Sequence, residues 1–330
     1  MQQRTLGETG IAVTPLGLGM AALGRPGYIN LGHAEDLKAE YDPAVMAAHA
    51  AAVLDAAWDA GVRYFDAARS YGRGEAFLGE WLRNRGITPE AVAVGSKWGY
   101  IYTADWQVDA EEHEVKEHSL DVFRRQWPES AELLEPHLRL YQVHSATLSS
   151  GVLENRPLLE AMAALRSDGV AVGLTTSGTD QAEVVLRALE LRVGGQRLFD
   201  VVQTTWNILE PSAGSALAAA SREGVGVIVK EAMANGRLAG RATGASDAVT
   251  AVLRREAERL ATTVDALALA AALAQPWADV VLSGAATPQQ VRSNAAAVSI
   301  ALDAQAWEAL GALTETPQTY WRTRSALPWT

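Results

Sequence analysis

The chain has 330 residues, of which 48% are hydrophobic and 20% charged, and its formal net charge at pH 7 is −11. This composition is ample for a core, and the acidic balance argues against nucleic acid or an anionic membrane as the main partner. The chain contains no cysteine, which excludes disulfides and thiolate metal sites.

The first element in chain order is a predicted β-hairpin at residues 4–15, which would close the bottom of the fold. After it come eight short apolar runs of strand length, separated by helical stretches. These runs are 14–19, the end of 56–66, 92–97, 138–144, the end of 163–176, 200–207, the end of 218–231, and 279–284.

Glycine marks the predicted helix ends, and proline marks the predicted helix starts. Three alanine-rich amphipathic stretches are each followed by a glycine and then by a valine that opens the next strand; the glycines are Gly61, Gly169 and Gly224. Glycine tolerates the left-handed turn that closes a helix. Pro157 and Pro288 stand where a first helical turn would begin, which suits the fixed φ of proline.

The alternation of strands and helices favours one barrel over two domains. Near-continuous apolar strands covered by helices are typical of a parallel sheet, and eight such units favour a closed barrel. The rival is a doubly wound sheet, but its G-x-G-x-x-G fingerprint is absent, and the glycine run at 17–24 has the wrong spacing. Residues 212–216 and 240–246 are interpreted as loops rather than linkers. We expect a single domain over residues 1–330, a (β/α)8 TIM barrel with an N-terminal β-hairpin.

Ionisable residues end three of the predicted strands, namely Asp66, Lys97 and His144, and Tyr71 lies in the loop just past the first. Barrel active sites lie at the carboxyl ends of the strands, so these side chains are expected to meet. Lys97 would be an ammonium that lowers the pKa of Tyr71, and Asp66 would keep that ammonium charged. His144 would polarise a carbonyl oxygen. Such a device gives a proton to a developing alkoxide and needs an external hydride donor.

These residues lie in stretches that resemble the aldo-keto reductase family over nearly the whole chain. The stretches TPLGLGM, GVRYFDAARSYGRGE, GSKWG, LYQVH and GAATPQQVRSN follow the order and spacing of that family. The resemblance implies a catalytic tetrad of Asp66, Tyr71, Lys97 and His144, with Tyr71 as the general acid. It also implies a nicotinamide cofactor across the barrel mouth and reduction of an aldehyde, ketone or imine of a small molecule.

The resemblance further implies cofactor-binding positions at several strand ends. These are Gly19, Met20, Asp66, Thr175, Thr176, Gln203, Lys230, Glu231, Ala232, Met233, Gly284, Ala286, Thr287, Gln290, Ser293 and Asn294. Thr175 and Thr176 replace the Ser-Asn pair of the family, and Lys230 and Glu231 replace its aromatic side chain. NADP(H) is favoured by the family default. Gly284 and Gln290 occupy positions that often carry cations for a 2′-phosphate, so NAD(H) is also possible.

Other segments suggest the walls of a substrate pocket. The long loop at 24–36 is either such a wall, with Tyr28 and His33, or a surface insertion, and the tail at 316–330 either closes over the site or covers the barrel exterior. Tyr28, Trp98, Tyr100 and Trp206 are candidate pocket residues. No metal site is expected, because the helical spacing assigned to Glu114 and His118 indicates a solvated helix face.

The expected partner is therefore a small carbonyl or imine compound, and the oligomeric state stays open. Two alternatives carry weight because Lys230 and Glu231 depart from the family: a cofactor-binding regulatory or redox-sensing protein, and a non-redox lyase or isomerase of a biosynthetic pathway. A cytoplasmic protein is expected, because no secretory signal is apparent and the longest apolar run, 266–274, is too short for a membrane span.

Overall fold

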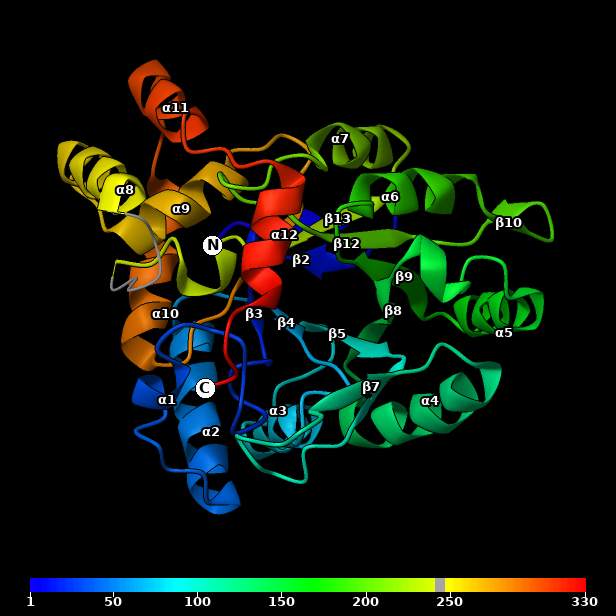
Figure 1. Cartoon of the computed structure of the whole chain (residues 1–330). Coiled ribbons are helices and arrows are strands. Elements are labelled where there is room, and N and C mark those ends of the chain that lie inside the picture. Colours follow the sequence, from blue (N-terminus) through cyan, green and yellow to red (C-terminus); the bar gives the residue numbers. More distant parts are fainter. Residues whose placement is uncertain (241–246) are drawn as a thin grey trace.

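The computed structural model describes residues 1–240 and 247–330 and contains a closed barrel of eight parallel strands (Figure 1). Around the barrel these are β3 (Leu16–Gly19), β4 (Tyr64–Asp66), β5 (Ala93–Trp98), β8 (Leu138–Ala146), β9 (Ala171–Thr176), β12 (Val201–Thr205), β13 (Gly226–Lys230) and β14 (Val280–Ser283). The last strand pairs with the first and closes the barrel. Each predicted apolar run overlaps one barrel strand, so the predicted (β/α)8 fold is confirmed.

Every barrel strand is followed by at least one helix (Figure 1). The helices are α1 (His33–Asp36), α2 (Pro43–Asp59), α3 (Gly74–Asn84), α4 (Leu120–Leu134), α5 (Arg156–Ser167), α6 (Gln181–Glu190), α7 (Gly214–Arg222), α8 (Asp247–Arg259), α9 (Val264–Leu273), α10 (Pro288–Ala295), α11 (Ala304–Gly311) and α12 (Pro317–Ser325). Short 3-10 turns lie at Leu148–Ser150, Ala234–Gly236 and Ala296–Ser299. Antiparallel ribbons pair β1 (Arg4–Thr5) with β2 (Ala12–Val13), β6 (Tyr100–Tyr102) with β7 (Glu114–Lys116), and β10 (Arg192–Val193) with β11 (Gln196–Arg197).

The barrel strands are buried on both faces. Every residue of β5, β12 and β14 is buried, because helices cover the outside of the barrel and side chains fill its inside. The apolar run noted at 266–274 lies mostly in α9, where seven of the ten helical residues are buried. Within residues 1–240 and 247–330, none of the helices has the length and apolar character that a membrane crossing requires.

The glycines predicted to close helices do so. Gly61, Gly169 and Gly224 have φ angles of +88°, +93° and +74°. At Gly224 a Cβ atom would meet only the end of the exposed Glu8 side chain, which can move, so the positive φ is what requires glycine there. The loop expected at 212–216 is partly wrong, because α7 begins at Gly214. The loop expected at 240–246 lies, beyond residue 240, outside the described residues.

The predicted N-terminal hairpin closes the bottom of the barrel. The loop between β1 and β2 carries Leu6, which is fully buried and packs in one apolar cluster with Tyr64, Ile228 and Val280 from three barrel strands. The Glu8 amide donates a hydrogen bond to the Gly224 carbonyl oxygen at 2.8 Å. The hairpin therefore belongs to the core of the barrel.

The loop at 24–36 and the tail at 316–330 lie together over the opposite end of the barrel. In Figure 1, helix α12 crosses in front of the strands, and the chain after it returns to the loop that follows β3. Tyr28 and Thr330 exchange two backbone hydrogen bonds, each 3.1 Å long. The helical spacing assigned to Glu114 and His118 is wrong, because Glu114 lies in strand β7. The ribbon of β6 and β7 is a third segment on this side.

Replacing Leu6 by alanine should lower the free energy of unfolding by about 2–5 kcal/mol, because it opens a cavity beneath the barrel. Urea denaturation measures the loss. Leu186→Ala, at a side chain that is 46% exposed, is the control and should change stability by less than about 0.5 kcal/mol. If Leu6→Ala proved as mild as the control, the hairpin would not belong to the cooperative core.

Candidate active site

The four residues predicted to form a tetrad meet at the carboxyl ends of the barrel strands. Asp66 ends β4, Lys97 lies near the end of β5, and His144 lies in β8. Lys97 Nζ forms a short ion pair with Asp66, donates a hydrogen bond to the Ala67 carbonyl oxygen at 2.8 Å, and lies 3.5 Å from the Tyr71 hydroxyl. The strand ends thus bring together the residues that the sequence pattern selected.

The second carboxylate oxygen of Asp66 accepts hydrogen bonds from the inner barrel wall. The Tyr64 hydroxyl donates at 3.1 Å, the Gln203 amide at 2.9 Å and the Gln142 amide at 3.5 Å. Asp66 and Lys97 are 2% and 1% exposed. A buried ion pair needs such additional donors because desolvation of two charges is costly. Tyr64 and Gln142 were not predicted, since neutral residues inside a strand resemble ordinary core positions.

His144 is positioned to act as a neutral group. Its ring contacts Tyr71 and Tyr100 edge to face, with centroids 5.6 and 4.9 Å apart. Burial, and then the charges of Lys97 and Lys230, hold the pKa of His144 well below its usual range. A neutral imidazole has one N–H donor and one acceptor nitrogen, so it can donate to a carbonyl oxygen without bringing a charge.

The expected effect of Lys97 on Tyr71 is wrong for this state of the protein. Burial, and then the charge of Asp66, raise the pKa of Tyr71, and Arg25 opposes them in part. The ammonium of Lys97 is already matched by Asp66, so the phenol is surrounded by a balanced pair within a dry site. Tyr71 therefore keeps its proton at neutral pH and releases it only to a strong base, which a developing alkoxide is.

Arg25 was not predicted from the sequence, and its side chain packs against Tyr71. It is 2% exposed, and one guanidinium nitrogen donates to the Ser70 carbonyl oxygen at 3.0 Å and to Glu114 at 2.8 Å. Its guanidinium carbon lies 5.4 Å from the Tyr71 ring centre and 4.8 Å from that of Trp329. The pairing joins segments 89 residues apart, and nothing in the local sequence signals it.

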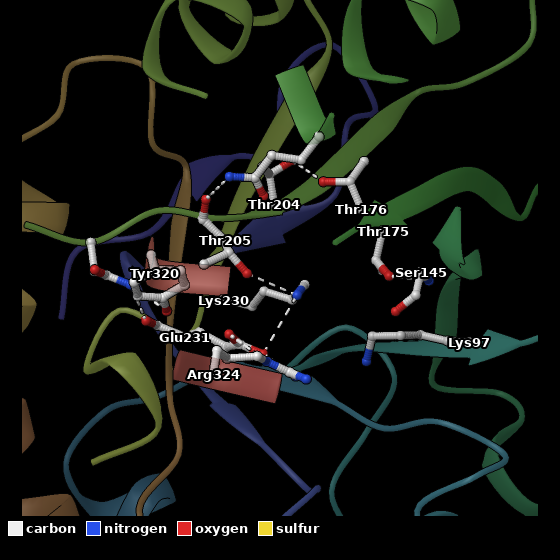
Figure 2. Close-up of polar contacts among 12 residues, drawn as sticks. Lys97, Ser145, Thr175, Thr176, Thr204, Thr205, Lys230, Glu231, Tyr320 and Arg324 are labelled. Atoms are coloured by element: carbon white, nitrogen blue, oxygen red, sulfur yellow. Dashed lines mark hydrogen bonds and ion pairs between the residues drawn. The ribbon is translucent and has the colours of Figure 1, made fainter. Parts of the chain in front are cut away.

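A second charged cluster lies across the cavity (Figure 2). The Lys230 ammonium donates to the Thr205 hydroxyl at 2.9 Å, and Arg324 forms an ion pair with Glu231 at 2.7 Å. Burial lowers the pKa of Lys230 to about 8. Burial alone would raise the pKa of Glu231, but Arg324 and then Lys230 outweigh it and lower that pKa to about 2. Arg324 was also missed, because its helix comes from the far end of the chain.

Thr175 and Thr176 lie beside the site but use their hydroxyl groups within the protein. Both are fully buried. The Thr175 hydroxyl oxygen accepts a hydrogen bond from the Ser145 amide at 2.7 Å, and the Thr176 hydroxyl donates to that of Thr204 at 3.1 Å (Figure 2). Ser145, at a φ of +54°, and Ser177 line the cavity in their place.

A cavity of about 380 Å³ opens between the two charged clusters, within the range of small-molecule sites. The predicted residues that line it are Gly19, Tyr28, Asp66, Tyr71, His144, Gln203, Lys230, Glu231, Ala232, Met233, Gly284 and Gln290. The predicted residues that do not line it are Met20, Lys97, Thr175, Thr176, Ala286, Thr287, Ser293 and Asn294. The loop at 24–36 and the tail at 316–330 both contribute walls, through Tyr28 and Trp329 among others.

The prediction that Trp98 and Trp206 line the pocket is wrong. Trp98 packs against Phe123 of α4, with ring centroids 5.1 Å apart, and Trp206 packs against Trp277 at 5.7 Å. Side chains alternate along a strand, so Trp98 points outward when Lys97 points to the barrel mouth. Neither tryptophan lines the cavity. Tyr100, also a candidate, does.

The far end of the cavity, near Gly284, is built from amides and carboxylates. Gln290 donates a hydrogen bond to Asp36 at 3.0 Å and accepts one from the Ala286 amide at 2.8 Å. Asn294 donates to the Ser283 hydroxyl at 2.8 Å, and its buried Oδ1 atom has no partner among the described residues. The Thr287 side chain caps α10, and Ser293 contacts Thr263.

Comparison with known proteins gives consistent matches. A sequence model of the Aldo/keto reductase family matches residues 15–315. Pyridoxal 4-dehydrogenase of Microbacterium luteolum is 34% identical over 164 residues, which are 43% of this chain and 43% of that relative. The uncharacterized oxidoreductase YrpG of Bacillus subtilis (strain 168) is 27% identical over 351 residues, covering 97% of this chain and 99% of the relative. The holo form of aldo-keto reductase AKR11C1 from Bacillus halodurans has the same fold, with a TM-score of 0.73 at 22% identity over 96% of this chain and 97% of that one.

Replacing Lys97 by methionine leaves the buried Asp66 without its cation, and the free energy of unfolding should fall by about 3–5 kcal/mol. Adding Asp66→Asn removes the orphaned charge, so the double variant should recover part of that loss in urea denaturation. Arg156→Gln breaks an exposed ion pair and should cost less than about 1 kcal/mol. Losses that simply add in the double variant would show that the two side chains are not coupled.

Proposed function

This chain belongs to the aldo/keto reductase family, and we propose that it uses a nicotinamide cofactor to reduce an aldehyde, ketone or imine of a small molecule. Members of this family are oxidoreductases that act on small carbonyl compounds. The observation that carries the proposal is the meeting of Asp66, Lys97, Tyr71 and His144 at one cavity end. We further propose that residues 1–330 act as one catalytic barrel domain.

The cavity suits a nicotinamide dinucleotide. It runs from Tyr71 and His144 past Gly19 to Gly284, and a Cβ atom added at Gly284 would meet nothing within 4 Å. Asn294 contacts the lining residue Ser283, and its unpartnered Oδ1 is a free acceptor beside this end of the cavity. When bound, the nicotinamide would supply the hydride.

The chain's own residues would supply the proton and hold the carbonyl group. The neutral His144 would donate an N–H hydrogen bond to the carbonyl oxygen and orient it. As negative charge grows on that oxygen, Tyr71 would transfer its hydroxyl proton to it. Lys97 would stabilise the phenolate left behind, and water would reprotonate it after product release. His144 and Lys97 would thus stabilise the negative charge, first on the carbonyl oxygen and then on the Tyr71 oxygen.

Two other roles share the same cavity: a redox-sensing protein that retains its cofactor, and a lyase or isomerase. No contact of the described residues favours either over reduction. The name of one relative, pyridoxal 4-dehydrogenase, supports including heteroaromatic aldehydes among the candidate substrates. Steady-state cofactor oxidation would exclude a sensor, and a product two hydrogens heavier than the substrate would exclude an isomerase.

Replacing Tyr71 by phenylalanine removes the proton donor, and turnover with NADH or NADPH should fall about 100- to 10,000-fold. Cofactor oxidation is followed at 25 °C with panels of aldehydes, ketones and imines, and cofactor affinity should change little. Tyr41→Phe, which removes a hydroxyl outside the cavity lining, is the matched control. Wild-type protein that never exceeds Tyr71→Phe on any substrate would refute carbonyl reduction.

The choice of dinucleotide should follow the charge near Gln290. Within the described residues that line this end of the cavity, Gln290 is bonded to Asp36, and Asp265 adds a second carboxylate. We propose that a 2′-hydroxyl suits this end better than a 2′-phosphate, which the carboxylates would repel, so NAD(H) is preferred despite the family default. Fluorescence titration should show NADH binding at least about tenfold more tightly than NADPH. Asp36→Asn should reduce the difference between the dissociation constants of NADH and NADPH. If the wild-type protein instead bound NADPH more tightly than NADH, NADP(H) would be the preferred cofactor.

A further inference from the structure

Lys230 has hydrogen-bonding capacity that the protein does not use. It ends β13, and its side chain lines the same cavity as Tyr71 and His144. Its ammonium donates to the Thr205 hydroxyl at 2.9 Å. Its other contact in the described parts of the chain is Glu231 at 3.7 Å, longer than a normal hydrogen bond. An ammonium has three donors, so Lys230 has donors free to bind a ligand.

Glu231 does not neutralise Lys230, because Arg324 already engages it. The Arg324 guanidinium donates to both carboxylate oxygens of Glu231, at 2.7 and 3.4 Å. An arginine that contacts a carboxylate in this two-point manner is its preferred partner. Glu231 therefore pairs with two cations, and its contact with Lys230 is weaker than its contact with Arg324.

The ion pairs around the catalytic residues contain more cations than carboxylates. The cations are Lys97, Arg25, Lys230 and Arg324, and the carboxylates paired with them are Asp66, Glu114 and Glu231. Two of the four cations therefore share one carboxylate, Glu231, although Asp265 adds a fourth carboxylate elsewhere in the cavity lining. In addition, the buried Nε atom of Arg25 has no partner in the part of the chain that the structure describes.

We propose that Lys230 binds an anionic group of the substrate, a carboxylate or a phosphate, and so selects small carbonyl compounds that carry a negative charge. The inference rests on the proposed carbonyl reduction, since it places the charge next to the group that Tyr71 and His144 would handle. An ammonium whose side chain is only 16% exposed, and which shares its carboxylate with an arginine, is costly, and an incoming anion would relieve that cost. Tyr28 and Trp329 add aromatic walls to the same cavity, which suits an aromatic acid.

The pyrophosphate of a dinucleotide could supply the same anionic chemistry, but the direction of the side chain favours the substrate. Figure 2 shows the Lys230 amine extending toward the side of the cavity where Lys97 and Ser145 lie. Lys230 and His144 both line this cavity. Gly284 and Gln290 lie past Ser283, beyond the end of β14, which is the strand next to β13.

Calorimetric titration with benzoate and benzamide tests the proposal without requiring turnover. Wild-type protein should bind benzoate at least about tenfold more tightly than benzamide, and Lys230→Gln should weaken benzoate binding about 10- to 100-fold while leaving benzamide binding unchanged. Lys230→Arg keeps the charge and should retain most of the preference. Arg322→Gln, which removes an exposed cation from α12, is the control. The proposal is overturned if wild type shows no preference, or if Lys230→Gln instead weakens NADH binding and leaves benzoate unaffected.

A kinetic arm uses 4-formylbenzoate and its neutral methyl ester. For wild type the acid should have the lower KM, and Lys230→Gln should raise that KM about 10- to 100-fold with little change in kcat, because the lost contact holds the substrate before and during reaction. Equal losses with acid and ester would overturn the role of Lys230. Absence of turnover with intact benzoate binding would instead count against carbonyl reduction and leave the anion site standing, so the two failures are distinguishable.

Discussion

The buried ion pair of Asp66 and Lys97 is the interaction on which the whole site depends. It joins β4 to β5, and the amides of Gln142 and Gln203 extend the same network to β8 and β12. Two charges taken out of water are tolerated only where such donors surround them. Four strands of the barrel must therefore keep their register for the pair to exist, and the position of Tyr71 follows from it. The rigid barrel thus holds Tyr71, the proposed proton donor, in a fixed position.

Around this fixed centre, the walls of the cavity come from segments that are distant in the sequence. Arg25 belongs to the loop after β3, Glu114 to the β6–β7 ribbon, and Arg324 to α12. Each of these charges pairs with a partner from another segment. Barrel enzymes vary their chemistry through such loops while the strands stay the same. The walls of the cavity therefore depend on how several distant segments fold together.

The sequence predicted the barrel and its tetrad because both follow short-range rules. Strand-length apolar runs, the helix-closing Gly61 and the residues that end strands are all visible locally. The pairing of Arg25 with Glu114 is not, since it depends on how two loops fold over the mouth. The outward position of Trp98 follows from strand alternation once Lys97 is placed inward, so the strand pattern already argued against Trp98 as a pocket residue. The pKa of Tyr71 is raised first by burial and then by the charge of Asp66, and that burial depends on segments that the local sequence does not bring together.

Following the transferred hydrogen tests most directly whether this site reduces carbonyl groups. The protein is incubated in ordinary water with 4-formylbenzoate and with NADH that carries deuterium at the transferable C4 position, and the product is analysed by mass spectrometry and proton NMR. The proposed function predicts an alcohol with one deuterium on the former carbonyl carbon, while the new hydroxyl proton comes from Tyr71 and ultimately from water. A product of unchanged mass, or an alcohol without deuterium, would contradict it.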